Sequence, residues 1–293
     1  MILDGKKLAN DIKNECIAKT KKLLSQKIVP GLAVVLVGDN PASQVYVSNK
    51  EKTAKEIGFF FHKETFPNDA QPEEIKKSIM NLNKNPDIHG IIVQLPLPSH
   101  LNENEIINTI DPSKDVDGLH PVNLGKLILE EESFIPCTPL GIMTILEKNN
   151  ISTKGKNTVV VGRSNIVGKP MAIILLSKHK GDATVTVCHS RTYNLPQICK
   201  TADILIVAIG KPKVINRNFV KEGAVIIDVG INRILDPSKP SGTKLTGDVD
   251  FDDVKDICSA ITPVPGGVGP MTVAMLMANT LKACERQFNI KYE

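Results

Sequence analysis

Apolar runs alternate with amphipathic segments along the first third of the chain. The runs 31–37 and 88–95 predict strands covered on both faces, as in a parallel sheet. The other elements that the same periodicities predict here are helices over 4–26, 41–57 and 72–82, and a strand over 59–66. This alternation of strand and helix predicts a parallel α/β layer with right-handed crossovers.

The second half of the chain repeats this pattern. Strands are predicted over 157–161, 183–188, 203–208 and 224–229, and helices over 139–146 and 271–284. Two segments carry no clear periodicity. Prolines and Asp-Gly turns make 111–138 an irregular but ordered loop, and the polar, turn-rich 235–246 is predicted to be a surface loop.

Composition narrows the class of protein. The chain has 293 residues, of which 41% are apolar and 23% charged, so one large or two medium soluble domains are expected. The net charge is +4, but the lysines are spread along the chain, which favours a solvated surface over a nucleic-acid track. No apolar run reaches the roughly 18 residues of a membrane span or forms a signal peptide at the start.

The cysteines favour a reduced, cytoplasmic protein. There are six, none forms a C-x-x-C pair, and no histidine cluster lies beside them. We therefore expect buried thiols, with no metal site and no disulfide framework.

The turn after the strand 157–161 has the form of a nucleotide-binding turn. Gly162 follows a valine-rich strand, Ser164 replaces the usual second glycine, and Gly168 comes one residue late. The amides at the start of the following helix favour an anion, and the serine hydroxyl adds a donor. We expect this turn to bind the phosphates of a dinucleotide.

The end of the next strand indicates which dinucleotide. NAD-binding units commonly have an acidic residue there, whereas this chain has His189, Ser190, Arg191 and Thr192. Together with Arg163 in the turn, these residues favour the 2′-phosphate of NADP. The alternative is that both arginines are ordinary surface cations.

A second group of polar residues lies in the first half. Tyr46 and Lys50 are four residues apart on one helix face, and Gln94 ends a buried strand, where ligands bind in open α/β sheets. Asp115 and Asp117 lie in the following loop. A surface pair and an ordinary acidic turn are the alternatives, and these residues alone indicate no substrate.

Seven segments, in order, resemble one family across nearly the whole chain. The family is the bifunctional methylenetetrahydrofolate dehydrogenase/methenyltetrahydrofolate cyclohydrolases, whose pattern also has the substituted glycine of the turn. The segments are YVSNK (46–50), VQLPLP (93–98), KDVDG (114–118), PCTPLG (136–141), GRSNIVGKP (162–170), DVGIN (228–232) and ITPVPGGVGPMT (261–272).

The resemblance implies an architecture and two reactions. It implies a folate-binding catalytic α/β domain over 1–140 plus 271–293, a Rossmann-like NADP-binding domain over 141–270, a cleft between them and a homodimer. It also implies oxidation of 5,10-methylenetetrahydrofolate by NADP⁺ and hydrolysis of the methenyl product to 10-formyltetrahydrofolate. This chemistry belongs to one-carbon metabolism and supplies purine biosynthesis.

The resemblance also implies roles for individual residues. Lys50 would be the hydrolytic base, Gln94 would orient it, Asp117 would accept hydrogen bonds from the pterin, and Tyr46 would stack on the folate. The other implied contacts are Val93, Leu95, Pro265, Gly266 and Gly267 with substrate, and Gly162, Arg163, Ser164, Ser190 and Ile231 with cofactor. For the glycines of 265–267, a purely structural turn is the alternative.

Two other classes of protein fit parts of the pattern. A shikimate-dehydrogenase-like oxidoreductase shares the two-domain plan but gives Tyr46 and segment 93–98 no role. A folate- or nucleotide-binding protein without catalysis is opposed by the intact set Lys50, Gln94 and Asp117. A fused formate-activating ligase domain is not expected, because the chain is too short and has no G-x-x-x-x-G-K-[ST] loop.

Overall fold

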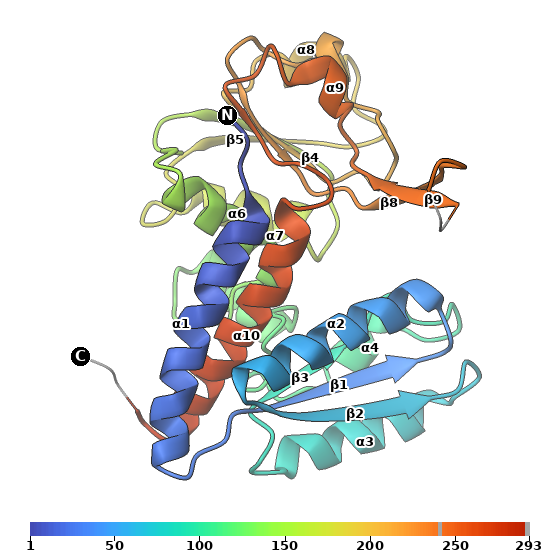
Figure 1. Ribbon diagram of the computed structural model, residues 1–293, viewed down its shortest axis with the longest axis vertical. Coiled ribbons are helices and arrows are strands. Elements are labelled where there is room, and N and C mark those ends of the chain that lie inside the picture. The colour runs from blue at the N-terminus through green and yellow to red at the C-terminus, as the bar shows by residue number, and fades with distance from the viewer. Residues whose placement is uncertain (240–241, 291–293) are drawn as a thin grey trace. The chain divides into compact units, whose positions relative to one another are not determined.

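The computed structural model describes residues 1–239 and 242–290. The chain divides into two compact units (Figure 1). Unit 1 comprises Met1–Ala9, Leu127–Glu131 and Thr138–Thr272, and unit 2 comprises Asn10–Lys126, Glu132–Cys137 and Val273–Glu293. The domain limits given above, 1–140 plus 271–293 and 141–270, stay a prediction.

Unit 2 contains a three-stranded parallel sheet in the order β2-β1-β3. Its strands are β1 (Gly31–Val37), β2 (Phe60–Phe66) and β3 (Gly90–Val93), and its helices include α2 (Pro41–Ile57), α3 (Pro72–Lys84) and α4 (Glu103–Ile107). All seven residues of the central strand β1 are buried, which is why its sequence is continuously apolar. Ile75 and Ile79 of α3 are buried in one cluster with Val35 and Ile91 of the sheet.

Helix α2 begins and ends where its sequence signals indicate. The Asn40 side-chain oxygen accepts hydrogen bonds from the amides of Ala42 (2.9 Å) and Ser43 (3.2 Å), and Pro41 occupies the first turn. Gly58 ends the helix in the left-handed conformation at φ 93°. These two caps fix the segment that carries Tyr46 and Lys50.

Unit 1 contains a five-stranded parallel sheet in the order β10-β7-β6-β4-β5. After β5 the chain returns to the other side of β4, so the direction of strand addition reverses there. In sheets of this kind, ligands bind outside the carboxyl ends of the strands at such a reversal. The strands are β4 (Asn157–Val161), β5 (Thr184–Cys188), β6 (Ile204–Val207), β7 (Val225–Asp228) and β10 (Ala260–Ile261).

The helices of unit 1 are short. They are α7 (Gly168–Leu176), α8 (Leu195–Cys199) and α9 (Phe251–Val254), with a 3-10 turn over Arg217–Phe219. Four further helices have residues in both units: α1 (Gly5–Ser25), α5 (Pro121–Ile128), α6 (Cys137–Lys148) and α10 (Val268–Gln287).

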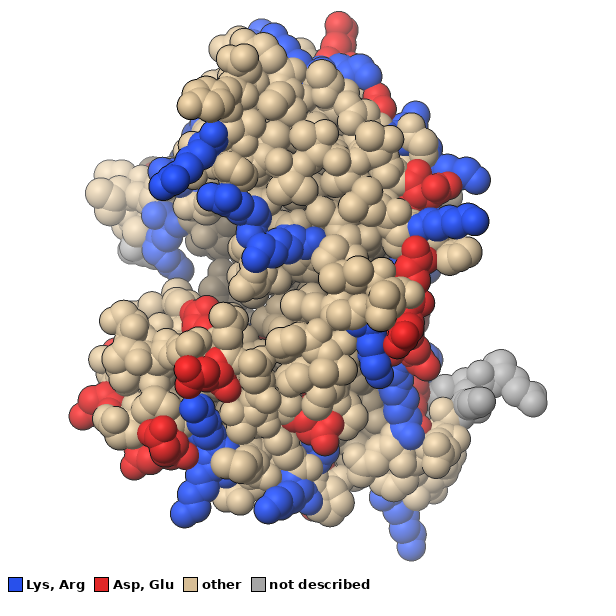
Figure 2. Space-filling view, turned by 180° about the vertical axis from the view of Figure 1, so that it is seen from behind, with Lys and Arg blue, Asp and Glu red and all other residues tan. Residues whose placement is uncertain are grey.

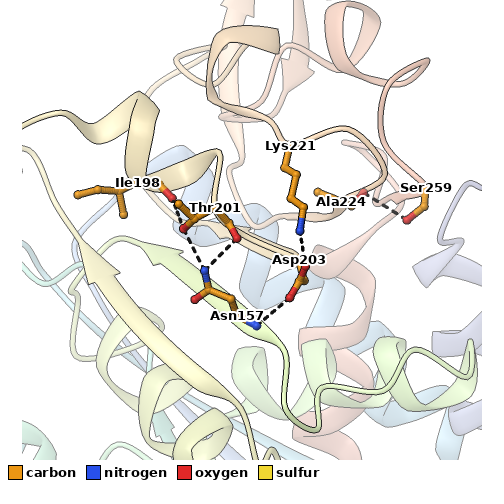
Figure 3. A network of polar contacts seen from close by, with 7 residues as sticks. All are labelled: Asn157, Ile198, Thr201, Asp203, Lys221, Ala224 and Ser259. Carbon is orange, nitrogen blue, oxygen red and sulfur yellow. Dashed lines mark hydrogen bonds and ion pairs between the residues drawn. The ribbon is translucent and has the colours of Figure 1, made fainter.

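Polar side chains connect the amino ends of the strands of unit 1 (Figure 3). Asp203 accepts hydrogen bonds from the Asn157 amide (2.9 Å) and from Lys221 Nζ (2.6 Å). The Asn157 side chain donates to both oxygens of Thr201, each at 2.9 Å. These contacts hold β4, β6 and β7 together at the end of the sheet opposite the expected nucleotide site.

Two segments differ from the sequence-based prediction. The irregular loop predicted over 111–138 contains α5, which begins at Pro121, where a proline needs no hydrogen-bond partner for its nitrogen. The surface loop predicted over 235–246 contains β9 (Thr243–Thr246), which pairs antiparallel with β8 (Asn232–Leu235). The sequence of β9 is mostly polar, so apolar periodicity did not predict a strand there. Residues 240 and 241 of the loop lie outside the described residues.

The surface carries both signs of charge. Figure 2 shows Lys and Arg side chains in separate groups over one face, with Asp and Glu side chains among them. Five of the six cysteines are buried, and Cys258 is half-buried. Within residues 1–239 and 242–290, no helix has the length and apolar character needed to cross a membrane.

Candidate functional site

A lysine and a glutamine form a pair in unit 2. Lys50, on α2, donates a hydrogen bond from Nζ to Gln94 Oε1 at 2.9 Å. Gln94 follows β3, is only 8% exposed, and donates from Nε2 to the Leu95 carbonyl at 2.7 Å. The glutamine amide is therefore fixed with its oxygen toward the lysine, and the sequence-predicted pair is brought together.

The surroundings of Lys50 disfavour its charged form. Burial lowers the pKa of the Lys50 ammonium, while the Asp117 carboxylate acts in the opposite direction. A neutral amine still has N–H groups for Gln94, and its lone pair is then free to accept a proton. The group can therefore act as a base, which an exposed lysine cannot do at neutral pH.

The loop that carries Asp117 is fixed by its backbone and by its neighbour Asp115. The Ile91 amide donates to the Lys114 carbonyl at 2.7 Å, which attaches the loop to β3. The buried Asp115 accepts hydrogen bonds from the His120 amide (2.8 Å) and from Asn123 Nδ2 (2.9 Å). Asp115 is thus a structural residue, whereas Asp117 is only half-buried.

The other residues predicted to contact substrate in unit 2 differ in exposure. Tyr46 is 38% exposed and lies one turn before Lys50 on α2. Val93 is buried at the end of β3, and Leu95 is partly buried against the core of the same sheet. Among these predicted contacts, Tyr46 is thus the aromatic side chain, and it has exposed surface area that a ligand can cover.

In unit 1, the turn after β4 has room only for glycine. A Cβ atom on Gly162, whose φ is +139°, would lie 2.3 Å from the Ala208 carbonyl oxygen. A Cβ atom on Gly168 would lie 2.2 Å from the Gly162 carbonyl oxygen. The late glycine therefore lets α7 begin directly against the turn, and the residues present fit a dinucleotide phosphate.

Ser164 occupies the place of the missing glycine and supports the helix. Its Oγ accepts hydrogen bonds from the amides of Val167 (3.2 Å) and Gly168 (3.4 Å). Because the hydroxyl acts as acceptor in both, its own hydrogen remains available for a ligand oxygen.

The remaining predicted cofactor residues lie on the surface of unit 1. Arg163 and Ser190 are exposed, and Ile231 is 42% exposed. Gly162 donates its amide to the Cys188 carbonyl at 2.9 Å, so the turn with Arg163 lies beside the end of β5, which leads to Ser190. Ile231 belongs to a different loop, after β7.

Residues 265–267 form a turn that packs against the start of α1. Gly266 has φ +113°, and its carbonyl accepts a hydrogen bond from the Lys6 amide at 2.9 Å. A Cβ atom on Gly5 would lie 1.9 Å from the Gly267 carbonyl oxygen. These glycines have a structural role, while Pro265 is exposed and accessible to a ligand.

Two buried aspartates that the sequence analysis did not single out position the loops of unit 1. Asp248 accepts hydrogen bonds from the amides of Ile209 (2.6 Å) and Gly210 (2.8 Å) and from Asn232 Nδ2 (2.8 Å). Asp228 accepts from the Gly230 amide at 2.9 Å and from the Asp248 amide at 3.0 Å. Their contacts fix the loop of Ile231 from both sides. The sequence signal for Asp228 is its position at the end of an apolar strand, in the segment DVGIN (228–232).

Burial also shifts the titration of Asp228. It raises the pKa of Asp228 to about 6, against the effect of the backbone amides, and the Asp248 carboxylate adds to the rise. Among the described residues, no cluster of His, Cys, Asp and Glu could hold a metal ion.

One parallel sheet carries a partly buried lysine paired with a glutamine, and the second carries a glycine turn at its reversal point. These features define a class, the two-domain nucleotide-dependent α/β enzymes. Residues 3–117 match the family model described as tetrahydrofolate dehydrogenase/cyclohydrolase, catalytic domain. Residues 136–288 match the NAD(P)-binding domain of the same family. The chain belongs to the tetrahydrofolate dehydrogenase/cyclohydrolase family, and the two-domain α/β fold class is confirmed.

Individual relatives match over nearly their full length. The bifunctional protein FolD of Prosthecochloris aestuarii is 54% identical over 294 residues, which cover 99% of this chain and 100% of that protein. The crystal structure of the bifunctional enzyme FolD from Campylobacter jejuni has a TM-score of 0.93 at 47% identity, covering 98% and 99% of the two chains. The Trypanosoma brucei enzyme, solved with NADP cofactor and inhibitor, has a TM-score of 0.93 at 38% identity, covering 98% of each.

Proposed function

We propose that this protein oxidises 5,10-methylenetetrahydrofolate to 5,10-methenyltetrahydrofolate with NADP⁺ and then hydrolyses that product to 10-formyltetrahydrofolate. The observation that carries the proposal is the 2.9 Å hydrogen bond from Lys50 Nζ to Gln94 Oε1, in the part of the chain that matches the family's catalytic domain. The shikimate-dehydrogenase-like alternative is set aside by family membership.

Lys50 is the base of the hydrolytic step. Its neutral Nζ takes a proton from the water that attacks the methenyl carbon and returns a proton to N5 as the N5–carbon bond opens. The hydroxyl proton of the adduct is released to solvent, and the formyl group stays on N10. A positively charged substrate beside the amine lowers the pKa of Lys50 further, in the same direction as burial. Gln94 holds the amine so that its lone pair faces the water.

The remaining residues of unit 2 bind and orient the folate. Tyr46 stacks on the ring system, and the Asp117 carboxylate accepts hydrogen bonds from the pterin. Val93 and Leu95 complete the folate contacts of unit 2. The oxidative step needs no base, because the two bridging nitrogens stabilise the developing cation, so orientation is the main contribution of the protein.

NADP⁺, when bound, accepts the hydride from the methylene carbon. Gly162 and Ser164 hold its phosphates, and Ile231 contacts the cofactor. Arg163 and Ser190 bind the 2′-phosphate, which supports NADP over NAD. The fit of the glycine turn and the absence of an acidic residue at the end of β5 support these assignments.

The further proposals concern assembly and location. The protein is a homodimer in the cytoplasm, binds neither nucleic acid nor membrane, and supplies 10-formyltetrahydrofolate for purine biosynthesis. Mixed surface charge supports the lack of nucleic-acid binding. Light scattering after size exclusion tests the dimer: a mass of one 31.9 kDa chain would contradict it.

A spectrophotometric assay with 5,10-methylenetetrahydrofolate and either nicotinamide cofactor tests the function. We expect reduced cofactor to accumulate with NADP⁺ and the methenyl absorbance to rise and then decay faster than without enzyme. Absence of cofactor reduction would contradict the dehydrogenase assignment. Decay at the uncatalysed rate would contradict the cyclohydrolase assignment.

A further inference from the structure

Asn279 links the C-terminal helix to the loops of the candidate folate site. It lies on α10, within unit 2, and is 5% exposed. Its Nδ2 donates to the Val116 carbonyl at 2.9 Å and to the Ile135 carbonyl at 3.1 Å, and contacts Cys137 Sγ at 3.7 Å. The Asn279 amide nitrogen thus contacts two segments, each more than 140 residues away from Asn279 along the chain.

Both of these segments adjoin the lysine base. The Val116 carbonyl belongs to the peptide bond that leads into Asp117, so fixing this carbonyl fixes the backbone of the aspartate. The Cys137 thiol donates to the same Val116 carbonyl at 3.3 Å. Burial raises the pKa of Cys137 well above its usual value, and the Asp117 carboxylate adds to the rise, so the sulfur is a neutral neighbour of Lys50.

Backbone hydrogen bonds hold the amides on either side of Asp117, from Val116 to the Lys114 carbonyl (2.9 Å) and from Gly118 to the Asp115 carbonyl (3.2 Å), whereas side chains hold the Val116 carbonyl. The attachment to β3 is at Ile91 and Lys114, before Asp117. Gly118, after it, has φ +72° and packs so closely on 134–136 that a Cβ atom would lie 2.6 Å from the Pro136 nitrogen. The Asn279 amide supports the peptide between these two points.

We infer that Asn279 is a positioning residue of the folate site, which sets where Asp117 and Cys137 lie relative to Lys50. This inference rests on the proposed function. Only a donor fits its place, because both backbone partners are carbonyl oxygens. An acidic side chain of the same shape would place oxygen against oxygen.

Steady-state kinetics of the full-length protein test this inference. We expect Asn279→Ala to raise KM for 5,10-methylenetetrahydrofolate about tenfold, because it removes the hydrogen bonds to the Val116 and Ile135 carbonyls that hold Asp117 in place. KM for NADP⁺ should not change, since the proposed cofactor residues belong to unit 1. Asn279→Asp should raise the folate KM further than Asn279→Ala. A general loss of stability would not produce this separation.

Thr280→Val is the matched control. Thr280 is the next residue on α10, is fully buried, and donates its hydroxyl to the Leu276 carbonyl of its own helix at 2.8 Å. The substitution removes a buried hydrogen bond from the same helix and none of the hydrogen bonds to the loop. It should lower the melting temperature but leave the folate KM within about twofold of the wild-type value.

The outcomes separate this inference from the proposed function. If the wild-type protein oxidises the folate but Asn279→Ala has the same folate KM as Thr280→Val, the positioning role is wrong. If the wild-type protein itself does not oxidise it, the proposed function fails instead. Should Asn279→Ala not fold, Asn279→Ser, which keeps one donor, takes its place. A folate KM unchanged in that variant would also overturn the inference.

Discussion

At the scale of single residues, the proposed hydrolytic chemistry depends on one amine that can lose its charge. A solvated lysine is protonated at neutral pH and cannot accept a proton from water. Burial next to Gln94 changes this, since the amide oxygen accepts an N–H from either form of the amine. The two activities therefore make different demands on Lys50: the hydrolysis needs its lone pair, and the hydride transfer does not.

Replacing Lys50 should separate the two activities. We expect Lys50→Met to lower cyclohydrolase activity by at least about 100-fold, the usual size of a general-base contribution. NADP⁺ binding should be retained, because the methionine has a similar volume and the cofactor residues lie in unit 1. Decay of the methenyl absorbance measures the hydrolysis. Hydrolysis at the wild-type rate would show that another group is the base.

Replacing Arg163 should change cofactor preference. The 2′-phosphate distinguishes NADP⁺ from NAD⁺, and a guanidinium binds phosphate in a two-pronged, charge-assisted way. We expect Arg163→Ala to raise KM for NADP⁺ by about tenfold or more and to leave KM for NAD⁺ nearly unchanged. An equal rise in KM for both cofactors would contradict the proposed contact between Arg163 and the 2′-phosphate.

The buried Asp228 should make stability depend on pH. Its pKa is raised in the folded state, from 3.8 to about 6, so its stabilising contribution is complete below pH 3.8 and is lost as the pH rises through 6. Asparagine does not titrate. The stability of wild type relative to Asp228→Asn should therefore fall by on the order of 3 kcal/mol between pH 4 and pH 7. Urea unfolding at several pH values measures this difference, and a constant gap would contradict it.

Residues whose contacts are local along the chain could be predicted from the sequence. Residues whose partners lie far away along the chain could not. The glycine turn is local, so Gly162 and Gly168 could be predicted from spacing. The contacts of Asn279 and Asp248 join segments far apart in the chain, and no periodicity predicts such a pairing. The roles of Lys50, Gln94 and Asp117 came from the family resemblance, since their spacing alone equally fits a surface pair and a turn.

At the scale of secondary structure, helix caps and apolar periodicity were sufficient to predict most of the long elements. The buried strand β1 and the capped helix α2 were predicted with their observed limits. The missed elements include α5 and β9, which are short and have sequences that carry proline or polar residues. Their formation depends on neighbours that a single sequence does not specify.

The cap of α2 offers a test at this scale. Asn40→Ala removes the oxygen that accepts the amides of Ala42 and Ser43, and should lower the free energy of unfolding by about 1 kcal/mol. Hydrolytic activity should change less than about twofold, because Gln94 still holds Lys50. Asn40→Asp keeps an acceptor and should remain near wild-type stability. A large loss of activity in Asn40→Ala would mean that the cap itself positions the base.

At the scale of the whole molecule, chain connectivity ties the two units together. The chain passes between them at five points, and four of these lie inside the helices α1, α5, α6 and α10. A helix that continues through such a point loses hydrogen bonds on both sides if either half melts. Neither unit is a continuous segment that could be cut out by one cleavage, and their folding is expected to be coupled.

We therefore expect one cooperative thermal transition, with equal calorimetric and van't Hoff enthalpies. The residues proposed to bind NADP⁺ belong to unit 1, so at 100 times its Kd the cofactor should stabilise the protein by about 2.7 kcal/mol and move the entire transition upward. Arg163→Ala should show a smaller shift at the same concentration. Two separate transitions, of which NADP⁺ moves only one, would mean that the helices shared by the units do not couple their unfolding.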